Sequence, residues 1–229
     1  MSQSAADAYL NALSGEHSKA RECVAALRAY LACGYLNIRA SSLYHALGTC
    51  ASDRLVMTIG RVLDDDADTI TAVSFCRYIE QNPRECAWAF SDDGRKEHPN
   101  PKAHVCGLAR KWASHWTNHP LHSRIKHSRD KTIAHLDKKQ WLGQEELGEI
   151  RVPEVEQLLD DFHRMLNEFG RLISKKQFVD LVFPIVSMES AMTIAGYEYW
   201  LKSMESGIIN REEFFERVDQ IKAALERYE

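Results

Sequence analysis

The segment PEVEQLLDDFHRMLNEFGRLIS, residues 153–174, carries the clearest amphipathic pattern of the sequence and decides the fold class. Its apolar side chains recur at spacings of three, four and seven residues, which predicts a helix with one buried face. Pro153 suits the first turn of such a helix, because a backbone N–H would have no partner there. The predicted buried face consists of Val155, Leu158, Leu159, Phe162, Met165, Leu166, Phe169, Leu172 and Ile173.

Helical patterns also cover most of the chain on both sides of this segment. Further helices are expected over residues 4–32, 35–63, 69–82, 102–119, 121–138, 177–205 and 210–228. Gly15 is expected to break the first of these helices, and Pro184 the sixth. The β-branched start of 69–82 is also compatible with a strand, but the chain contains no convincing series of strands. The sequence therefore predicts an all-α fold.

Residues 83–101 interrupt the helical pattern. Their prolines, together with the sequence Ser-Asp-Asp-Gly, predict a loop or an insertion, which Trp88 and Phe90 would anchor to the body of the protein. We expect a helical domain over residues 1–176, with this irregular insertion inside it. Residues 177–229 are expected to form a C-terminal helical extension packed on that domain.

The overall charge excludes one class of function. The chain has 29 Lys and Arg against 33 Asp and Glu, a net charge of −4, so it is not a generally basic nucleic-acid-binding protein. The six cysteines form no Cys-x-x-Cys pair, and the N-terminus has no basic region followed by an apolar run, so we expect a reduced, cytoplasmic protein. No apolar stretch approaches the roughly 20 residues that span a bilayer, so no membrane partner is expected.

Positive charge is concentrated in HSRIKHSRDKTIAHLDKK, residues 122–139. The window 120–140 contains six Lys and Arg against two Asp, a charge of +4, which leaves −8 for the rest of the chain. A solvated helix face is one interpretation of such a run, and local contact with RNA phosphates is the other. The residues predicted for RNA contact are Arg124, Lys126, His127, Lys131, Lys138 and Lys139.

The same stretch holds a candidate catalytic group, Arg129, Asp130 and His135. A histidine can take a proton from a 2′-hydroxyl near neutral pH, and a planar arginine can stabilise charge on a phosphate. Six residues apart on a regular helix, Arg129 and His135 lie about 120° apart around the axis. They converge only if the helix starts, ends or distorts between them, or if a two-fold dimer completes the site. The simpler interpretation is a surface arginine and a structural histidine.

The stretch Arg129–Asp137, with Arg-Asp-Lys followed by Ala-His, resembles the signature of the HEPN superfamily, in its abortive-infection (AbiU-like) branch. The segment Ile59–Asp65, IGRVLDD, is similar to a helix-ending segment of the same branch. The resemblance covers roughly residues 20–175. It implies an HEPN-like antiparallel helical bundle, here with extra C-terminal helices.

The resemblance also implies a function. Active members are metal-independent endoribonucleases without a cofactor, often homodimers, and frequently toxins of toxin–antitoxin or phage-defence (abortive-infection) systems. It assigns Arg129 to the phosphate, His135 to general base or acid catalysis and Asp130 to support of the site. The implied partners are RNA, a second copy of the chain and a nucleotidyltransferase-type antitoxin. Two alternatives stay open, a catalytically inactive RNA- or nucleotide-binding module and a structural interaction protein that uses the last helix.

Two further clusters have competing interpretations. His115 and His119 are four residues apart and could share a metal, with His122 as third ligand. We favour surface or interface histidines and assign no metal site. The acidic run that follows Leu63 suits a helix end better than a cation site, and its Asp64 or Asp65 could reach Arg129.

Overall fold

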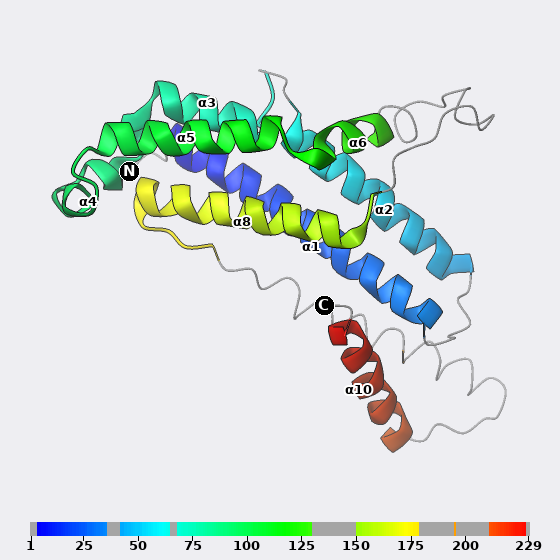
Figure 1. Ribbon diagram of the computed structural model, residues 1–229. Helices are drawn as coiled ribbons and strands as arrows, with labels where there is room; N and C mark the ends of the chain where they lie inside the picture. The colour runs from blue at the N-terminus through cyan, green and yellow to red at the C-terminus, as the bar shows by residue number, and fades with distance from the viewer. Residues whose placement is uncertain are drawn as a thin grey trace. The chain divides into compact units, whose positions relative to one another are not determined.

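A computed structural model describes residues 4–35, 42–64, 68–129, 150–178, 195 and 211–227. All elements of this part of the chain are helical, which confirms the predicted all-α class (Figure 1). The α-helices are α1 (Ala5–Tyr35), α2 (Ser42–Leu63), α3 (Ala72–Gln81), α4 (Asp92–Glu97), α5 (Pro101–Thr117), α6 (Pro120–Ser128), α8 (Val152–Ser174) and α10 (Arg211–Arg227), and the 3-10 helices are η1 (Pro83–Glu85) and η2 (Ala87–Phe90).

The chain divides into two compact units, to each of which α1 and α2 contribute. Met1–Ala20 and Val56–Asp180 form the first, and Arg21–Leu55 and Leu181–Glu229 form the second. The candidate residues that the structure describes all lie in the first unit. The domain boundary expected between residues 176 and 177 stays a prediction.

Helix α8 is the central element of the first unit. All nine side chains predicted for its inner face are buried, and Pro153 lies in its first turn. The helix ends at Ser174 and is followed by its C-cap Lys175, whose φ of 56° places it in the left-handed region. The three-four periodicity therefore determined both the position and the buried face of this helix.

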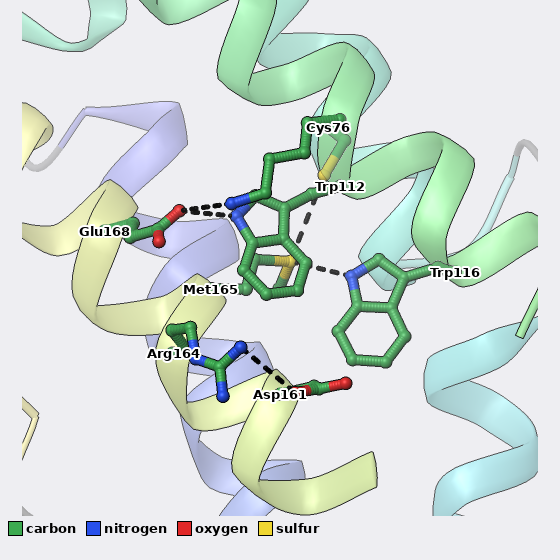
Figure 2. Close-up of polar contacts among 8 residues, drawn as sticks. Cys76, Trp112, Trp116, Asp161, Arg164, Met165 and Glu168 are labelled. Carbon is green, nitrogen blue, oxygen red and sulfur yellow. Dashed lines mark hydrogen bonds and ion pairs between the residues drawn. The ribbon is translucent and has the colours of Figure 1, made fainter.

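Helices α5 and α6 run antiparallel to α8 along one of its sides (Figure 1). The indole Nε1 of Trp112 donates to Glu168 Oε2 at 2.7 Å, and Trp116 Nε1 donates to the sulfur of Met165 at 3.0 Å (Figure 2). Residue numbers therefore increase along α5 in the direction in which they decrease along α8, as expected for two antiparallel helices. Pro120 starts α6 as a new helix, in agreement with the separate helices expected over 102–119 and 121–138.

Helix α1 also runs antiparallel to α8 within this unit. His17 Nε2 lies 3.1 Å from the carbonyl of Leu159, and Asp7 pairs with Lys176 at 2.9 Å. The expected break at Gly15 is wrong, since α1 continues through this residue. A glycine inside a helix costs about 1 kcal/mol relative to alanine, and burial of neighbouring side chains such as Leu13 outweighs that cost.

The segment 83–101 differs from the predicted loop, since it contains η1, η2 and α4. Cys86 and Ala89 are its buried apolar anchors, whereas the predicted anchors Trp88 and Phe90 are half-buried. Ser91 caps α4 by accepting from the backbone N–H of Gly94 at 3.1 Å. The prolines and the capping serine thus mark starts of short helices rather than an open loop.

Helix α3 lies within the predicted segment 69–82 and packs on α5. Thr71 and Ser74 form a reciprocal capping box at its start, with both hydrogen bonds at 2.9 Å. This cap explains why the β-branched beginning is helical rather than extended, because both donors are satisfied by side chains.

The second unit contains α10, which lies in the predicted terminal helix. Val218 and Ile221 of its apolar stripe are buried, Phe214 is half-buried and Phe215 is 55% exposed. The predicted start of this helix at Asn210 and most of the predicted helix over 177–205 lie outside the described residues.

Two further features concern the described part of the chain as a whole. None of its helices is both long and apolar enough to cross a membrane. The cysteines whose side chains are described carry free thiols, and burial raises the pKa of Cys86 to about 12, with Glu85 and Cys106 acting in the same direction. A thiol with so high a pKa is un-ionised at neutral pH and packs as an apolar group.

Candidate active site

Arg129 stands at the end of α6. Helix α6 ends at Ser128, and the backbone N–H of Arg129 donates to the carbonyls of Ile125 and Lys126. Arg129 itself has π-helical backbone geometry, so the regular α-helix is distorted at this point. A distortion here meets one of the conditions under which an arginine and a histidine six residues later could converge. Asp130 and His135 lie outside the described residues, so their convergence with Arg129 stays a prediction.

The guanidinium of Arg129 reaches back to the end of α2. Its Nη1 donates to Asp64 Oδ2 at 2.7 Å and to the carbonyl of Gly60 at 3.4 Å. The side chain of Arg129 is 17% exposed and that of Asp64 25% exposed, so water screens this ion pair only in part. The prediction that Asp64 could reach Arg129 is confirmed.

Gly60 makes this approach possible. A β-carbon at position 60 would lie 2.9 Å from Cδ and 3.7 Å from Nη1 of Arg129. Any larger residue would therefore push the arginine away from α2. Sequence reasoning singled out the segment around Gly60 but gave the glycine no role, because its importance depends on a side chain 69 positions later.

A cavity of about 270 Å³ lies beside Asp64. Its walls are Ala12, Leu13, Glu16, Arg61, Asp64, Thr69 and Ile70. Arg61 pairs with Glu16 at 3.3 Å, and Ile70 is 50% exposed at the rim. The cavity is slightly smaller than a typical site for a whole drug-sized ligand, so it suits one part of a larger substrate. Sequence reasoning missed it, because its walls come from α1, α2 and the turn before α3.

Arg124 has a structural partner at the start of α8. Its Nη2 donates to Glu154 Oε1 at 2.8 Å and its Nη1 to Oε2 at 3.2 Å. The hydrogen bond from Arg124, followed by that from the backbone of Arg151, lowers the pKa of Glu154. The bidentate pair joins α6 to the N-terminus of α8, where a carboxylate is also favoured by the helix dipole.

The remaining predicted RNA contacts divide into two groups. Lys126 is exposed and His127 half-buried on α6, three and two residues before Arg129. Lys131, Lys138 and Lys139 lie outside the described residues. The RNA-binding role of the whole group, including Arg124, stays a prediction.

A second and larger cavity, of about 590 Å³, also lies in the first unit, and the sequence did not predict it. Its walls are Trp88, Glu97, His98, His104, Leu108, Lys111, Glu168, Arg171, Leu172 and Lys175. The rings of His98 and His104 stack with centroids 3.9 Å apart, and Lys175 Nζ lies 4.9 Å from the Trp88 centroid. Burial, followed by the charge of His98, lowers the pKa of His104.

Comparison with known proteins identifies one family. The sequence profile HEPN_AbiU2, described as AbiU2, matches residues 3–186. The match spans the segments that carry Gly60, Asp64 and Arg129, together with all of α8. No curated protein matches the chain, and no solved structure does either.

Proposed function

The chain belongs to the AbiU2 family of HEPN domains, and from that premise we propose that it is a metal-independent endoribonuclease. The family assignment confirms the resemblance drawn from the Arg129–Asp137 stretch. The observation that best supports the proposal is the position of Arg129, which the end of α6 and the Asp64 carboxylate hold in place. A fixed arginine is what stabilisation of a phosphate requires, because a group oriented beforehand needs no reorganisation during the reaction.

In the proposed reaction, the 2′-oxygen attacks the adjacent phosphorus and the bond to the 5′-oxygen breaks. His135 takes the proton of the 2′-hydroxyl or supplies one to the leaving oxygen. The Arg129 guanidinium stabilises negative charge on the phosphate, and Asp130 supports the site. The products are a 2′,3′-cyclic phosphate and a free 5′-hydroxyl. The atoms and charges of this reaction therefore balance without a metal or a cofactor.

The proposal includes the partners of such an enzyme. RNA would bind along α6 and the residues that follow it, where Lys126 is exposed. We further propose a cytoplasmic homodimer that acts as a toxin or phage-defence effector, paired with a nucleotidyltransferase-type antitoxin. The local excess of cations in a net acidic chain supports RNA contact at this place and not over the whole surface.

One observation favours a second candidate, a catalytically inactive RNA- or nucleotide-binding module. Arg129 is mostly buried and already bonded to Asp64, so phosphate would have to share the guanidinium with a carboxylate. A protein of this kind would hold RNA in a salt-dependent manner and leave it intact.

Cleavage of a labelled structured RNA, such as tRNA, in EDTA tests these candidates. Wild type should cut and leave cyclic phosphate ends, and His135→Ala should lower the rate roughly 10²–10⁴-fold, as loss of a general acid or base does. Arg129→Ala should also lose activity, whereas Arg95→Ala, on the exposed face of α4, is the matched control and should keep it. Intact RNA with every folded variant, together with retained binding, would support the inactive module instead.

A third alternative, a structural interaction protein that uses the last helix, has its own test. Such a protein would neither cut nor bind RNA, and removal of residues 208–229 would abolish contact with its partner. Loss of RNA cleavage or binding on this truncation would argue for a role of the segment in the enzyme itself.

A further inference from the structure

Three side chains that can bind a metal ion meet on the side of α5 and α6 that faces α8. The potential ligand atoms of His115, His119 and Asp161 all lie within 4.8 Å of one another. His115 Nε2 is 3.1 Å from Asp161 Oδ2, and the rings of His115 and His119 are 5.4 Å apart between centroids. His119 is the N-cap of α6, so the group connects α5, the start of α6 and α8.

From this geometry we propose that His115, His119 and Asp161 form a binding site for a late first-row divalent cation of the Zn²⁺ type. Two imidazole nitrogens and one carboxylate oxygen are a donor set that zinc accepts, with one further position open to water. Bonds of about 2.0–2.1 Å in a tetrahedral arrangement place ligand atoms about 3.3 Å apart. The pair His115–Asp161 is already close to that separation, and a side-chain adjustment brings His119 to the same distance.

The state of the two histidines fits this role. His115 Nε2 is buried and makes no hydrogen bond, although the carboxylate is 3.1 Å away. Buried ring nitrogens normally have a partner, and a metal ion would supply one. Burial, followed by the charge of His115, lowers the pKa of His119.

Asp161 is oriented by neighbours on its own helix. Its Oδ1 pairs with Arg164 Nη1 at 3.4 Å (Figure 2). The same oxygen accepts from Gln157 Nε2 at 3.4 Å, while Oδ2 faces His115. Support of this kind, from outside the ligand set, fixes the direction of a ligand oxygen. The side chain of Asp161 is 13% exposed, so a bound ion would be shielded from bulk water on this side.

Metal binding by His119 would break one hydrogen bond that its side chain makes in this structure. The Nδ1 atom of His119 accepts from the backbone N–H of Leu121 at 3.2 Å, and metal binding through either ring nitrogen removes this bond. His122, which the sequence suggested as third ligand, is not in the group that the described residues form, and Asp161 takes its place. The spacing of histidines alone could not show this, because Asp161 is on another helix.

The expected effect is structural, since the site would tie the start of α6 to α5 and α8. It is separate from the proposed RNA chemistry, which the assay in EDTA measures without metal. The two proposals can therefore fail independently.

The test uses the full chain, freed of metal with EDTA and then titrated with Zn²⁺ by calorimetry, with Co²⁺ as a spectroscopic substitute. Wild type should bind one ion at this site, with weak visible Co²⁺ bands and no thiolate charge-transfer band. Zn²⁺ should also raise Tm, because a ligand that binds only the folded state stabilises it. Asp161→Asn and His119→Gln should each weaken binding about 10-fold or more, with helix content checked by circular dichroism.

His122→Gln and His98→Gln are the matched controls and should retain wild-type affinity. His119 is only half-buried, so His119→Gln should disturb the fold less than Asp161→Asn. It therefore keeps the test possible if Asp161→Asn fails to fold. No Zn²⁺ uptake by wild type, or unchanged uptake in folded His119→Gln, would overturn the proposal. A thiolate band in the Co²⁺ spectrum that survives in His119→Gln would place the ion on cysteines and likewise overturn it.

Discussion

The Arg129 guanidinium lies 2.7 Å from the Asp64 carboxylate and rests on the backbone of Gly60, so the end of α2 holds the arginine at the end of α6. This arrangement connects the two segments that carry the family resemblance. Gly60, Asp64 and Arg129 thus form one structural unit. The sequence shows the three residues but not the contacts between them.

The contact with Gly60 gives the first prediction. Gly60→Ala should displace the Arg129 side chain and lower RNA cleavage at least 10-fold, because a small misplacement of a positioned group lowers the rate strongly. Gly107→Ala is the matched control, since a β-carbon at that exposed position of α5 meets nothing within 4 Å. The control should keep full activity and gain up to about 1 kcal/mol in stability. Equal activity of both variants would argue against a role for the Gly60 contact.

Removal of the charge on Asp64 should separate binding from chemistry. Asp64→Asn keeps the shape of the side chain but frees positive charge on Arg129 for phosphate. We expect tighter RNA binding and a kcat lowered roughly 10- to 100-fold, because the guanidinium is no longer held in one orientation. Single-turnover cleavage and equilibrium binding, measured on the same RNA, distinguish the two effects. A kcat equal to wild type would show that Asp64 does not position the arginine.

The basic stretch should produce a measurable salt dependence. If Lys126 contacts a phosphate, Lys126→Ala should weaken RNA binding and reduce the slope of log K against log salt by about 0.7 for a single strand. Lys102→Ala, also exposed but near the start of α5, should leave the slope unchanged. An unchanged slope for Lys126→Ala would remove this residue from the RNA contact.

The core beneath α5 should be sensitive to the volume at Met165. This side chain is fully buried and accepts the indole N–H of Trp116 on its sulfur. Met165→Ala should lower the free energy of unfolding by roughly 2–5 kcal/mol, whereas Met165→Leu conserves volume and should cost less than about 1.5 kcal/mol. Urea unfolding followed by circular dichroism measures both. Similar losses in the two variants would mean that the sulfur contact matters more than the volume.

Two histidines should make stability depend on pH. Burial is the largest cause that lowers the folded-state pKa of His104 and His119 below 6.5. Their neutral forms therefore contribute stability above about pH 6.5, and this contribution is lost as the pH falls through that value.

In EDTA, Tm should accordingly fall between pH 7 and pH 5. His98 and Glu168 act on His104, and His115, Asp161, His122 and Arg124 act on His119. Each substitution by glutamine should reduce the fall, and the double variant should reduce it most. An identical fall in wild type and the double variant would assign the pH dependence to other groups.

The sequence by itself determined the helical class, the position of α8 and all nine of the buried apolar residues predicted on its inner face. It also predicted that Asp64 or Asp65 could reach Arg129, which the structure confirms for Asp64. These features follow from local rules, since helical periodicity and capping act over a few residues. The short helices of 83–101 were missed because proline and glycine mark both loops and helix starts.

Only the tertiary structure decided which distant side chains meet. Three contacts join residues from different helices. Arg129 lies against Gly60, Arg124 pairs with Glu154, and Asp161 approaches His115 of α5 and His119 at the start of α6. The packing of helices sets these contacts, and packing depends on the shapes of whole faces and not on spacing along one segment. For this reason the sequence identified candidate residues, whereas the fold determined the partners of those that the structure describes.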